Sequence, residues 1–251
     1  MNNVYAAPES ELRYETPSDH AGGTIEDAIA GNIDISMTGT MGEAWRNMKG
    51  FKLSCHVAFF LYFVIAMIAS MISYPIVFGL MSIGADQNTA GAVGAVLQLF
   101  ASIAVMPMFM GIHIMGIRHA EGKSVSAGSI FGYFSKIPAV FLCYIVMIIM
   151  IMLGMFLLIL PGIYLMIAYM FAMPLVVEKN MSAWQSLEVS RKALTRKWFP
   201  MFGVLFLMGL VNTLAIFTLG ILWIWTIPWS VLTMSMIYTK LFGAEPHTLA
   251  D

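Results

Sequence analysis

The chain has 251 residues, of which 59% are hydrophobic and only 11% are charged, and its mean hydropathy is +0.81. Soluble domains carry roughly 25% charged residues, so this composition excludes a water-soluble globular fold. The formal net charge is −1, and no nucleic-acid partner is expected from such a balance.

The charged residues are confined to short stretches of the chain. Between Lys52 and Arg118 the only formal charge is Asp86, and none lies between Lys136 and Glu178. Stretches of this length without charge are typical of helices that cross a bilayer. The sequence therefore predicts an all-α integral membrane protein.

Three regions follow from the distribution of charge and hydropathy. Residues 1–39 hold seven acidic residues against the single base Arg13 and are rich in Pro, Gly, Ser and Thr, which predicts a disordered acidic tail. Residues 40–243 form the predicted six-helix transmembrane domain. Residues 244–251 form a short second tail.

Six apolar segments are each expected to cross the bilayer as a helix of about 20 residues. In chain order they are Leu53–Phe78, Ala90–Ile117, Pro138–Leu160, Ile163–Val177, Phe199–Leu219 and Ile221–Phe242. The fourth segment is short for a full crossing. Pro174 and Pro228 lie within segments and predict kinks.

The basic residues orient these segments. All 13 Lys and Arg fall before the first segment, between the second and third, between the fourth and fifth, or at the end of the sixth. The other loops carry Asp86 and no base. The positive-inside rule then places both termini in the cytoplasm, as in a multi-pass protein of the bacterial inner membrane.

The loops on the outer side are short, so consecutive segments are expected to form three hairpins. Pro161-Gly162 is a turn dipeptide, because glycine tolerates positive φ, and it predicts a tight structural turn between the third and fourth segments. Thr-Leu-Gly at residues 218–220 is the corresponding turn between the fifth and sixth.

A cytoplasmic amphipathic helix is predicted before each hairpin. Thr40 and Ser182 each stand three residues ahead of Glu or Gln, as in a capping box, and Ser126 starts a similar segment. In the third copy an apolar face contains Leu187 and Leu194. An amphipathic basic helix with flanking tryptophans is expected in the headgroup layer. Its residues predicted to contact lipid headgroups or a protein partner are Trp184, Arg191, Lys192, Arg196, Lys197 and Trp198.

The same region carries a family resemblance. Leu160–Tyr164 reads LPGIY and is followed by Pro174, Glu178, a Leu187–Lys192 segment and Trp198. This pattern resembles a group of prokaryotic six-helix membrane proteins that includes the YciC-like family and the membrane domain attached to some glycerophosphodiester phosphodiesterases. Ser186 stands where that group usually has alanine. The resemblance implies a six-helix membrane fold and no particular activity.

One segment of the second span contains soft metal ligands. Met106, Met110 and His113 follow at i, i+4 and i+7, and thioether and imidazole groups suit Cu(I). The chain has 23 methionines in total, so the alternative is that these residues fill apolar space. No cofactor is otherwise expected.

No zinc-protease, Walker, nucleophile-elbow or dinucleotide motif is present, so an enzyme is not expected. The sequence favours a membrane protein that binds lipids, or a protein partner at its cytoplasmic face, in envelope homeostasis. The alternative is transport: a transporter or channel for a small or amphipathic solute, with Cu(I) as one such solute.

Overall fold

The computed structural model describes residues 22–250, and the regular elements in that part of the chain are all helical. Residues 1–21, which include most of the predicted acidic tail, lie outside the described residues. The elements are α1 (Ile25–Ala30), α2 (Met37–Arg46), α3 (Lys52–Met71), α4 (Ser73–Ser82), α5 (Gln87–Ala120), the 3-10 helix η1 (Ala127–Lys136), α6 (Ile137–Leu157), α7 (Ile159–Ala168), α8 (Ala172–Glu178), α9 (Ala183–Thr195), α10 (Trp198–Leu214), the 3-10 helix η2 (Ala215–Thr218), α11 (Trp223–Phe242) and α12 (Pro246–Leu249).

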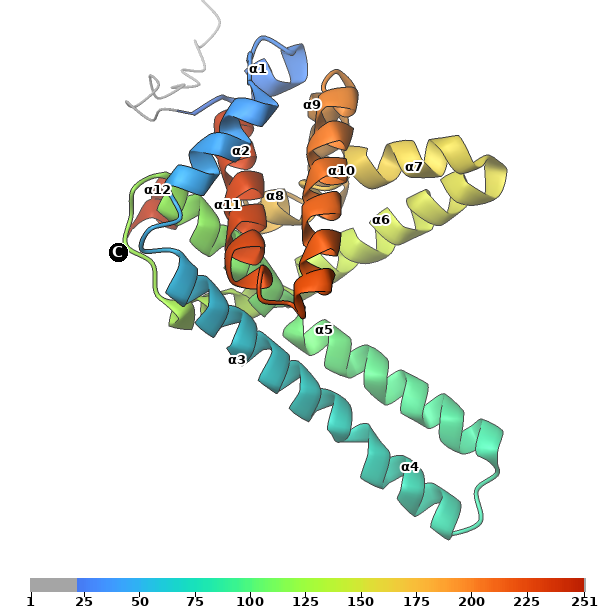
Figure 1. Ribbon diagram of the computed structural model, residues 1–251. Helices are drawn as coiled ribbons and strands as arrows, with labels where there is room; N and C mark the ends of the chain where they lie inside the picture. Colours follow the sequence, from blue (N-terminus) through green and yellow to red (C-terminus); the bar gives the residue numbers. More distant parts are fainter. Residues whose placement is uncertain (1–21, 251) are drawn as a thin grey trace, which may run out of the picture.

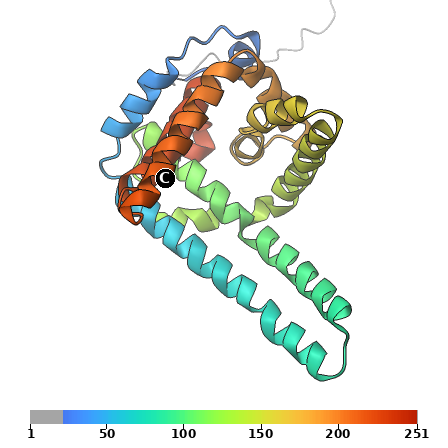
Figure 2. The same cartoon turned by 45° about the vertical axis from the view of Figure 1, so that its right-hand side comes forward.

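The helices spread from a packed base into three arms (Figure 1). The longest arm contains α3, α4 and the first half of α5, the second contains α6 and α7, and the third contains α10 and the start of α11. The base comprises α1, α2, α8, α9, α12 and the ends of α5 and α11 that lie against them. Figure 2 shows the same division from a second direction.

The first arm turns at a capped helix start. The Asp86 carboxylate accepts hydrogen bonds from the backbone amides of Asn88 and Thr89 at 2.9 and 3.0 Å, which are amides that α5 itself leaves unpaired. Hydrogen bonds from Thr89 hold the pKa of this carboxyl below its usual value. α3 ends at Met71, four residues before Pro75, because a proline ring crowds the carbonyl four positions earlier.

The second arm corrects the prediction of a turn at Pro161-Gly162. α6 ends at Leu157, and the chain reverses at Leu158, whose backbone is extended (φ −158°, ψ 138°). Pro161 and Gly162 lie in the first turn of α7, where the missing N–H of proline removes no helical hydrogen bond. Gly162 is needed for close contact: a Cβ there would lie 2.4 Å from Met155 Cγ.

α11 passes through the middle of the molecule, and most of its residues from Thr226 onward are buried. Its contact with α5 depends on Gly116, where a Cβ would lie 2.2 Å from the hydroxyl oxygen of Ser235. That hydroxyl donates a hydrogen bond to the backbone carbonyl of His113 at 3.2 Å. α11 is therefore covered by other helices of the protein along much of its length.

Part of the predicted disordered tail is folded. α1 packs against α9 and α11, so residues 22–39 contain one whole helix and the beginning of another. Ser36 caps α2, with its hydroxyl accepting a hydrogen bond from the Gly39 amide at 3.1 Å. Thr40, the predicted cap, lies inside α2 and donates to the Ser36 carbonyl at 3.0 Å. The capping residue therefore stands four positions earlier than the sequence analysis placed it.

The predicted tail at residues 244–251 is also held to the base through residue 250. Arg118, at the end of α5, donates hydrogen bonds to the carbonyls of Thr248 and Ala250 at 2.9 and 2.7 Å. Carbonyls in and after α12 are thus satisfied by a side chain from a helix far away in the sequence.

Five helical segments in the described part of the chain are long and apolar enough to cross a membrane. They are Lys52–Ser82, Gln87–Ala120, Ala127–Leu157, Ile159–Glu178 and Trp198–Thr218. The structure therefore has the apolar helices of a polytopic membrane protein. The predicted sixth span is not among the five, because α11 carries Trp, Ser and Thr residues that lower its hydropathy.

One contact bears directly on the predicted sixth span. The ammonium of Lys52, at the start of α3, lies 5.1 Å from the centroid of the Trp225 ring, near the start of α11. The six-span prediction places these two residues at opposite faces of the bilayer. The count of six, the three hairpins and the interfacial helices stay predictions.

Candidate functional site

The residues predicted to contact lipid lie on and around α9. Ser182 caps this helix as predicted, with its hydroxyl accepting a hydrogen bond from the Gln185 amide at 3.4 Å. Leu187 and Leu194, on the predicted apolar face, are 2% and 0% exposed, and α9 packs on α1, α6, α7 and α8. Protein therefore covers Leu187 and Leu194, which the sequence analysis placed on a face expected to lie in the headgroup layer.

Two of the predicted cations share one carboxylate on α9. Arg191 donates hydrogen bonds from Nε and Nη2 to the two oxygens of Glu188, at 3.0 and 2.8 Å. The Lys192 ammonium lies 3.3 Å from the same carboxylate. The hydrogen bonds from Arg191 hold the pKa of the Glu188 carboxyl below its usual value, and they raise the pKa of the Arg191 guanidinium. One negative charge thus offsets part of the positive charge on this helix.

A third predicted cation holds the short helix α1 in place. Arg196 donates a hydrogen bond from Nη1 to the Ala30 carbonyl at 2.6 Å, and its side chain covers Gly31. A cation near the last carbonyls of a helix is favourable. Lys192 is exposed and Lys197 is half buried. Arg196 therefore has a structural role besides any contact with lipid.

The two predicted tryptophans differ in their surroundings. Trp184 is 62% exposed, whereas Trp198 is half buried and donates a hydrogen bond from its indole to the Tyr164 carbonyl at 3.2 Å. The Tyr164 hydroxyl oxygen lies 2.6 Å from that of Thr195. The structure thus brings the Leu160–Tyr164 motif against the end of α9 and the start of α10.

A serine of α9 forms hydrogen bonds with backbone groups at the break between α7 and α8. α7 ends at Ala168 and α8 begins at Ala172, shortly before Pro174. The buried Ser190 hydroxyl donates to the Ala168 carbonyl at 2.7 Å and accepts from the Phe171 amide at 3.3 Å. Backbone groups freed by the break are therefore not left unpaired in the protein interior.

A buried acidic residue joins α8 to the C-terminal segment. Glu178 is 1% exposed, and its carboxylate accepts hydrogen bonds from the Tyr238 hydroxyl at 2.9 Å and from the backbone amide of Glu245. The Lys179 ammonium lies 3.5 Å from Glu178 and 2.9 Å from the Glu245 carboxylate. Sequence analysis noted Glu178 only within the family pattern. The sequence offered one signal for the importance of Glu178: it is the acidic residue that directly follows the apolar segment ending at Val177.

The predicted metal ligands lie among packing contacts of α5. Met110 is 1% exposed, Met106 packs on the edge of the core, and the His113 ring stands edge-on to Phe109 with centroids 5.2 Å apart. Within residues 22–250, no group of three or more His, Cys, Asp or Glu side chains lies close enough together to hold a metal ion. The Cu(I) hypothesis for the Met and His set stays a prediction.

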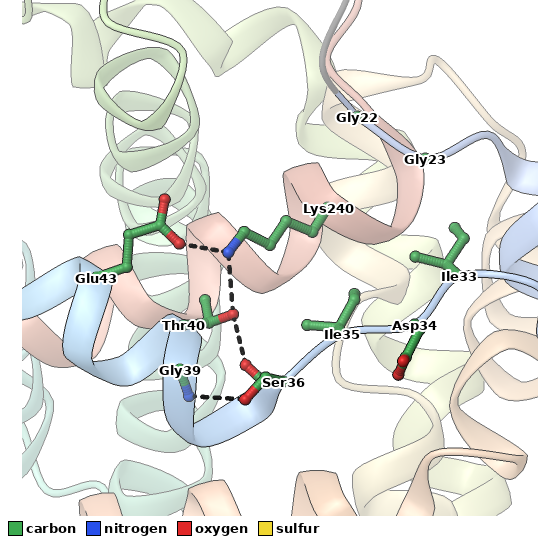
Figure 3. A pocket seen from close by; sticks show the side chains of 10 residues that line it. All are labelled: Gly22, Gly23, Ile33, Asp34, Ile35, Ser36, Gly39, Thr40, Glu43 and Lys240. Carbon is green, nitrogen blue, oxygen red and sulfur yellow. Dashed lines mark hydrogen bonds and ion pairs between the residues drawn. The ribbon is translucent and has the colours of Figure 1, made fainter.

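A polar cavity of about 550 Å³ opens between the α1–α2 linker, the first turns of α2 and the end of α11 (Figure 3). Its charged lining residues are Asp34, Glu43 and Lys240. The Lys240 ammonium forms an ion pair with Glu43 and donates a hydrogen bond to the Thr40 hydroxyl at 3.2 Å. Figure 3 shows the Asp34 carboxylate pointing away from that ammonium.

The rim of this polar cavity consists of backbone in close contact. The Gly23 amide donates a hydrogen bond to the Lys240 carbonyl at 3.1 Å. A Cβ on Gly22 would lie 2.7 Å from the Cα of Gly243. Two glycines therefore let the chain before α1 run directly against the end of α11.

An apolar cavity of about 350 Å³ lies between α2 and α10. Met37 and Met41 line it from α2, and Val204 and Leu207 line it from α10. Ile35 lines both cavities. Sequence analysis missed them, because their walls come from residues far apart in the chain and partly from a segment expected to be disordered.

Comparison with models of protein families, with curated proteins and with solved structures finds no match to this chain.

Proposed function

We propose that this chain is a multi-pass protein of the bacterial inner membrane, with six crossings and both termini in the cytoplasm. In this proposal it binds lipid at its cytoplasmic face and has no catalytic activity. The observation that carries the proposal is the separation of apolar from charged residues: large apolar side chains are exposed along the arms, and no Lys or Arg falls within residues 53–117, 137–178 or 198–239.

The exposed residues of the arms support placement in a bilayer. Phe63, Phe78, Phe156, Phe206 and Phe217 are between 65% and 90% exposed. A soluble monomer rarely exposes so much apolar surface, whereas lipid tails are as apolar as these side chains. The three arms are therefore the parts that the proposal places in the hydrocarbon core.

Contacts of the C-terminal segment support an even number of crossings. Lys240 pairs with Glu43, which precedes the first span, and Arg118, after the second span, bonds the Thr248 carbonyl. Lys179, after the fourth span, lies 2.9 Å from the carboxylate of Glu245. Because charged side chains that pair in this way lie on one side of a bilayer, these contacts support a return of the chain to the side on which α2 lies.

The lipid contact is proposed for Lys192, in the last turn of α9, and Lys197, which follows the end of that helix. Arg196 bonds Ala30 and Arg191 bonds Glu188, so these two side chains have partners within the protein. Lys192 is exposed and lies 3.3 Å from the Glu188 carboxylate, whose two oxygens already accept hydrogen bonds from Arg191, and Lys197 is half buried just beyond the helix. Each basic residue near an anionic surface contributes about 1 kcal/mol of attraction.

The test replaces both lysines in one variant, Lys192→Gln with Lys197→Gln. We expect its affinity for phosphatidylglycerol to fall about 30-fold, which corresponds to about 2 kcal/mol. Native mass spectrometry of the detergent-purified chain, titrated with this lipid, measures the affinity. The matched control is Lys49→Gln with Lys123→Gln, which removes the same charge elsewhere on the base. An equal loss in both variants would contradict a specific role for α9.

A further inference from the structure

We infer that the polar cavity and the apolar cavity together form a binding site for one zwitterionic phospholipid. The headgroup occupies the polar cavity, beside Lys240 and Asp34, and an acyl chain enters the apolar cavity between α2 and α10. This site is separate from the α9 lysines, and it rests on the proposed function only in requiring that α10 lies in the membrane.

The first argument is that two neighbouring cavities differ in their charged lining residues. The polar cavity has three charged side chains in its wall, whereas the apolar cavity is lined by Ile, Met, Val, Leu, Pro and Gly with one threonine. Both volumes fall within the range of about 300–1,000 Å³ that is typical of ligand sites. Ile35 belongs to both walls, so the two cavities are neighbours, and we assign the polar end of one molecule to the first cavity and its apolar end to the second.

The second argument is the place of α10. Four of the first ten residues of this helix line the apolar cavity, namely Pro200, Gly203, Val204 and Leu207, and α10 belongs to a segment that is apolar enough to cross a membrane. Trp198 stands at its start, and tryptophan favours the level of the headgroups. An acyl chain can therefore reach the apolar cavity from the bilayer while its headgroup stays at the level of the base.

The third argument is charge complementarity. Lysine has three N–H donors, of which the Lys240 ammonium uses two, for Thr40 and Glu43. The remaining donor is available to a phosphate oxygen. Asp34 is exposed, and its carboxylate points away from Lys240, so it meets the other end of a headgroup. A headgroup with a phosphate followed by an ammonium complements both Lys240 and Asp34. A purely anionic headgroup would instead face the carboxylates of Asp34 and Glu43, with only Lys240, already paired with Glu43, as a cation.

Two glycines of α10 provide a matched pair of variants. A Cβ at Gly203 or at Gly209 would meet no atom within 4 Å, so both positions accept a larger side chain without strain. Only Gly203 lines the apolar cavity. The variant Gly203→Leu therefore fills the cavity, and Gly209→Leu adds the same side chain to the same helix outside it.

Native mass spectrometry of the full chain in detergent measures binding of phosphatidylethanolamine and phosphatidylglycerol with identical acyl chains. We expect Gly203→Leu to bind phosphatidylethanolamine about tenfold more weakly than the unaltered chain, and Gly209→Leu to bind it as the unaltered chain does. Asp34→Asn should also weaken phosphatidylethanolamine binding. Glu26→Gln, which removes an exposed carboxylate of α1 outside the cavity, should not.

Two results would overturn the inference. One is equal phosphatidylethanolamine affinity in Gly203→Leu and Gly209→Leu. The other is a loss of phosphatidylglycerol binding in Gly203→Leu as large as the loss of phosphatidylethanolamine binding. The double lysine variant of α9 separates this site from the proposed function, because it should weaken phosphatidylglycerol binding and leave phosphatidylethanolamine binding unchanged.

Discussion

At the scale of single residues, the buried carboxylate of Glu178 joins three parts of the base. It accepts a hydrogen bond from Tyr238 of α11 and another from the amide of Glu245, and Lys179 lies beside it. A buried carboxylate is costly unless it is paired and hydrogen-bonded. These donors therefore make α8, α11 and the C-terminal segment depend on one another.

Removing one donor should destabilise the protein. We expect Tyr238→Phe to lower the free energy of unfolding by about 1–3 kcal/mol, because a buried carboxylate loses a hydrogen bond. Glu178→Ala should cost about 2–4 kcal/mol, since it leaves both the Tyr238 hydroxyl and the Glu245 amide without their acceptor. Thermal unfolding of the detergent-purified variants measures both effects. The control is Tyr144→Phe, whose hydroxyl makes no hydrogen bond within residues 22–250. Equal melting temperatures for the two tyrosine variants would contradict this account.

At the scale of helices, the two helices of the second arm, α6 and α7, come into close contact at a pair of glycines. A Cβ on Gly154 of α6 would lie 3.0 Å from the backbone nitrogen of Gly162 in α7. The two helices thus approach so closely at the reversal that their backbones are nearly in contact. Close approach through small residues is common between membrane helices.

A larger residue at this contact should separate the two helices. We expect Gly162→Val to destabilise the protein by about 1–3 kcal/mol, because its side chain would overlap with Met155. Gly209→Val, where a Cβ meets open space, serves as the control in the same unfolding measurement. Equal melting temperatures for the two valine variants would show that the glycine contact does not contribute to stability.

The same scale shows what could be predicted from the sequence. Apolar runs located the arms, and prolines marked the break between α7 and α8. The Ser182 cap was also predictable, because a hydroxyl three residues ahead of Gln185 is a local signal. α1 was missed, because its six residues are too few for a helical period. Periodicity also identified the apolar face of α9 without showing that protein would cover Leu187.

The two cavities could not be predicted from the sequence, for a different reason. Lys240 meets Glu43 across 197 residues of chain, and Met41 shares its cavity with Leu207 of α10. No local sequence pattern predicts a contact between residues that are so far apart in the chain. Only the packing of α2 between α10 and α11 brings these side chains together.

At the scale of the whole molecule, the contacts of the C-terminal segment and the contact at Lys52 constrain the path of the chain. An even number of crossings follows if the cations share one side of the bilayer. The proximity of Lys52 to Trp225 fits a third arm that inserts less deeply than the other two. Cysteine labelling distinguishes a full third hairpin from a shallow one.

The six-crossing proposal predicts which single cysteines react with a membrane-impermeant maleimide added to intact cells. Asp86→Cys, Leu158→Cys and Ile221→Cys should be labelled, because each lies at the tip of an arm, and Lys123→Cys should be labelled only after lysis. The native Cys55 and Cys143 are buried and stay in place. Failure at position 221 alone would indicate a re-entrant third arm, and labelling of position 123 in intact cells would refute the orientation.

The bond between Trp229 and the Met41 carbonyl, at 2.9 Å and across 188 residues, has a consequence for the order of biosynthesis. At about 5–20 residues per second, the ribosome needs roughly 10–40 s to proceed from α2 to the helix that holds it. During that interval Met37 and Met41 lack their final neighbours, so a chaperone or the insertion machinery has to shield them. The contact between α2 and α11 can thus form only when most of the chain has been synthesised.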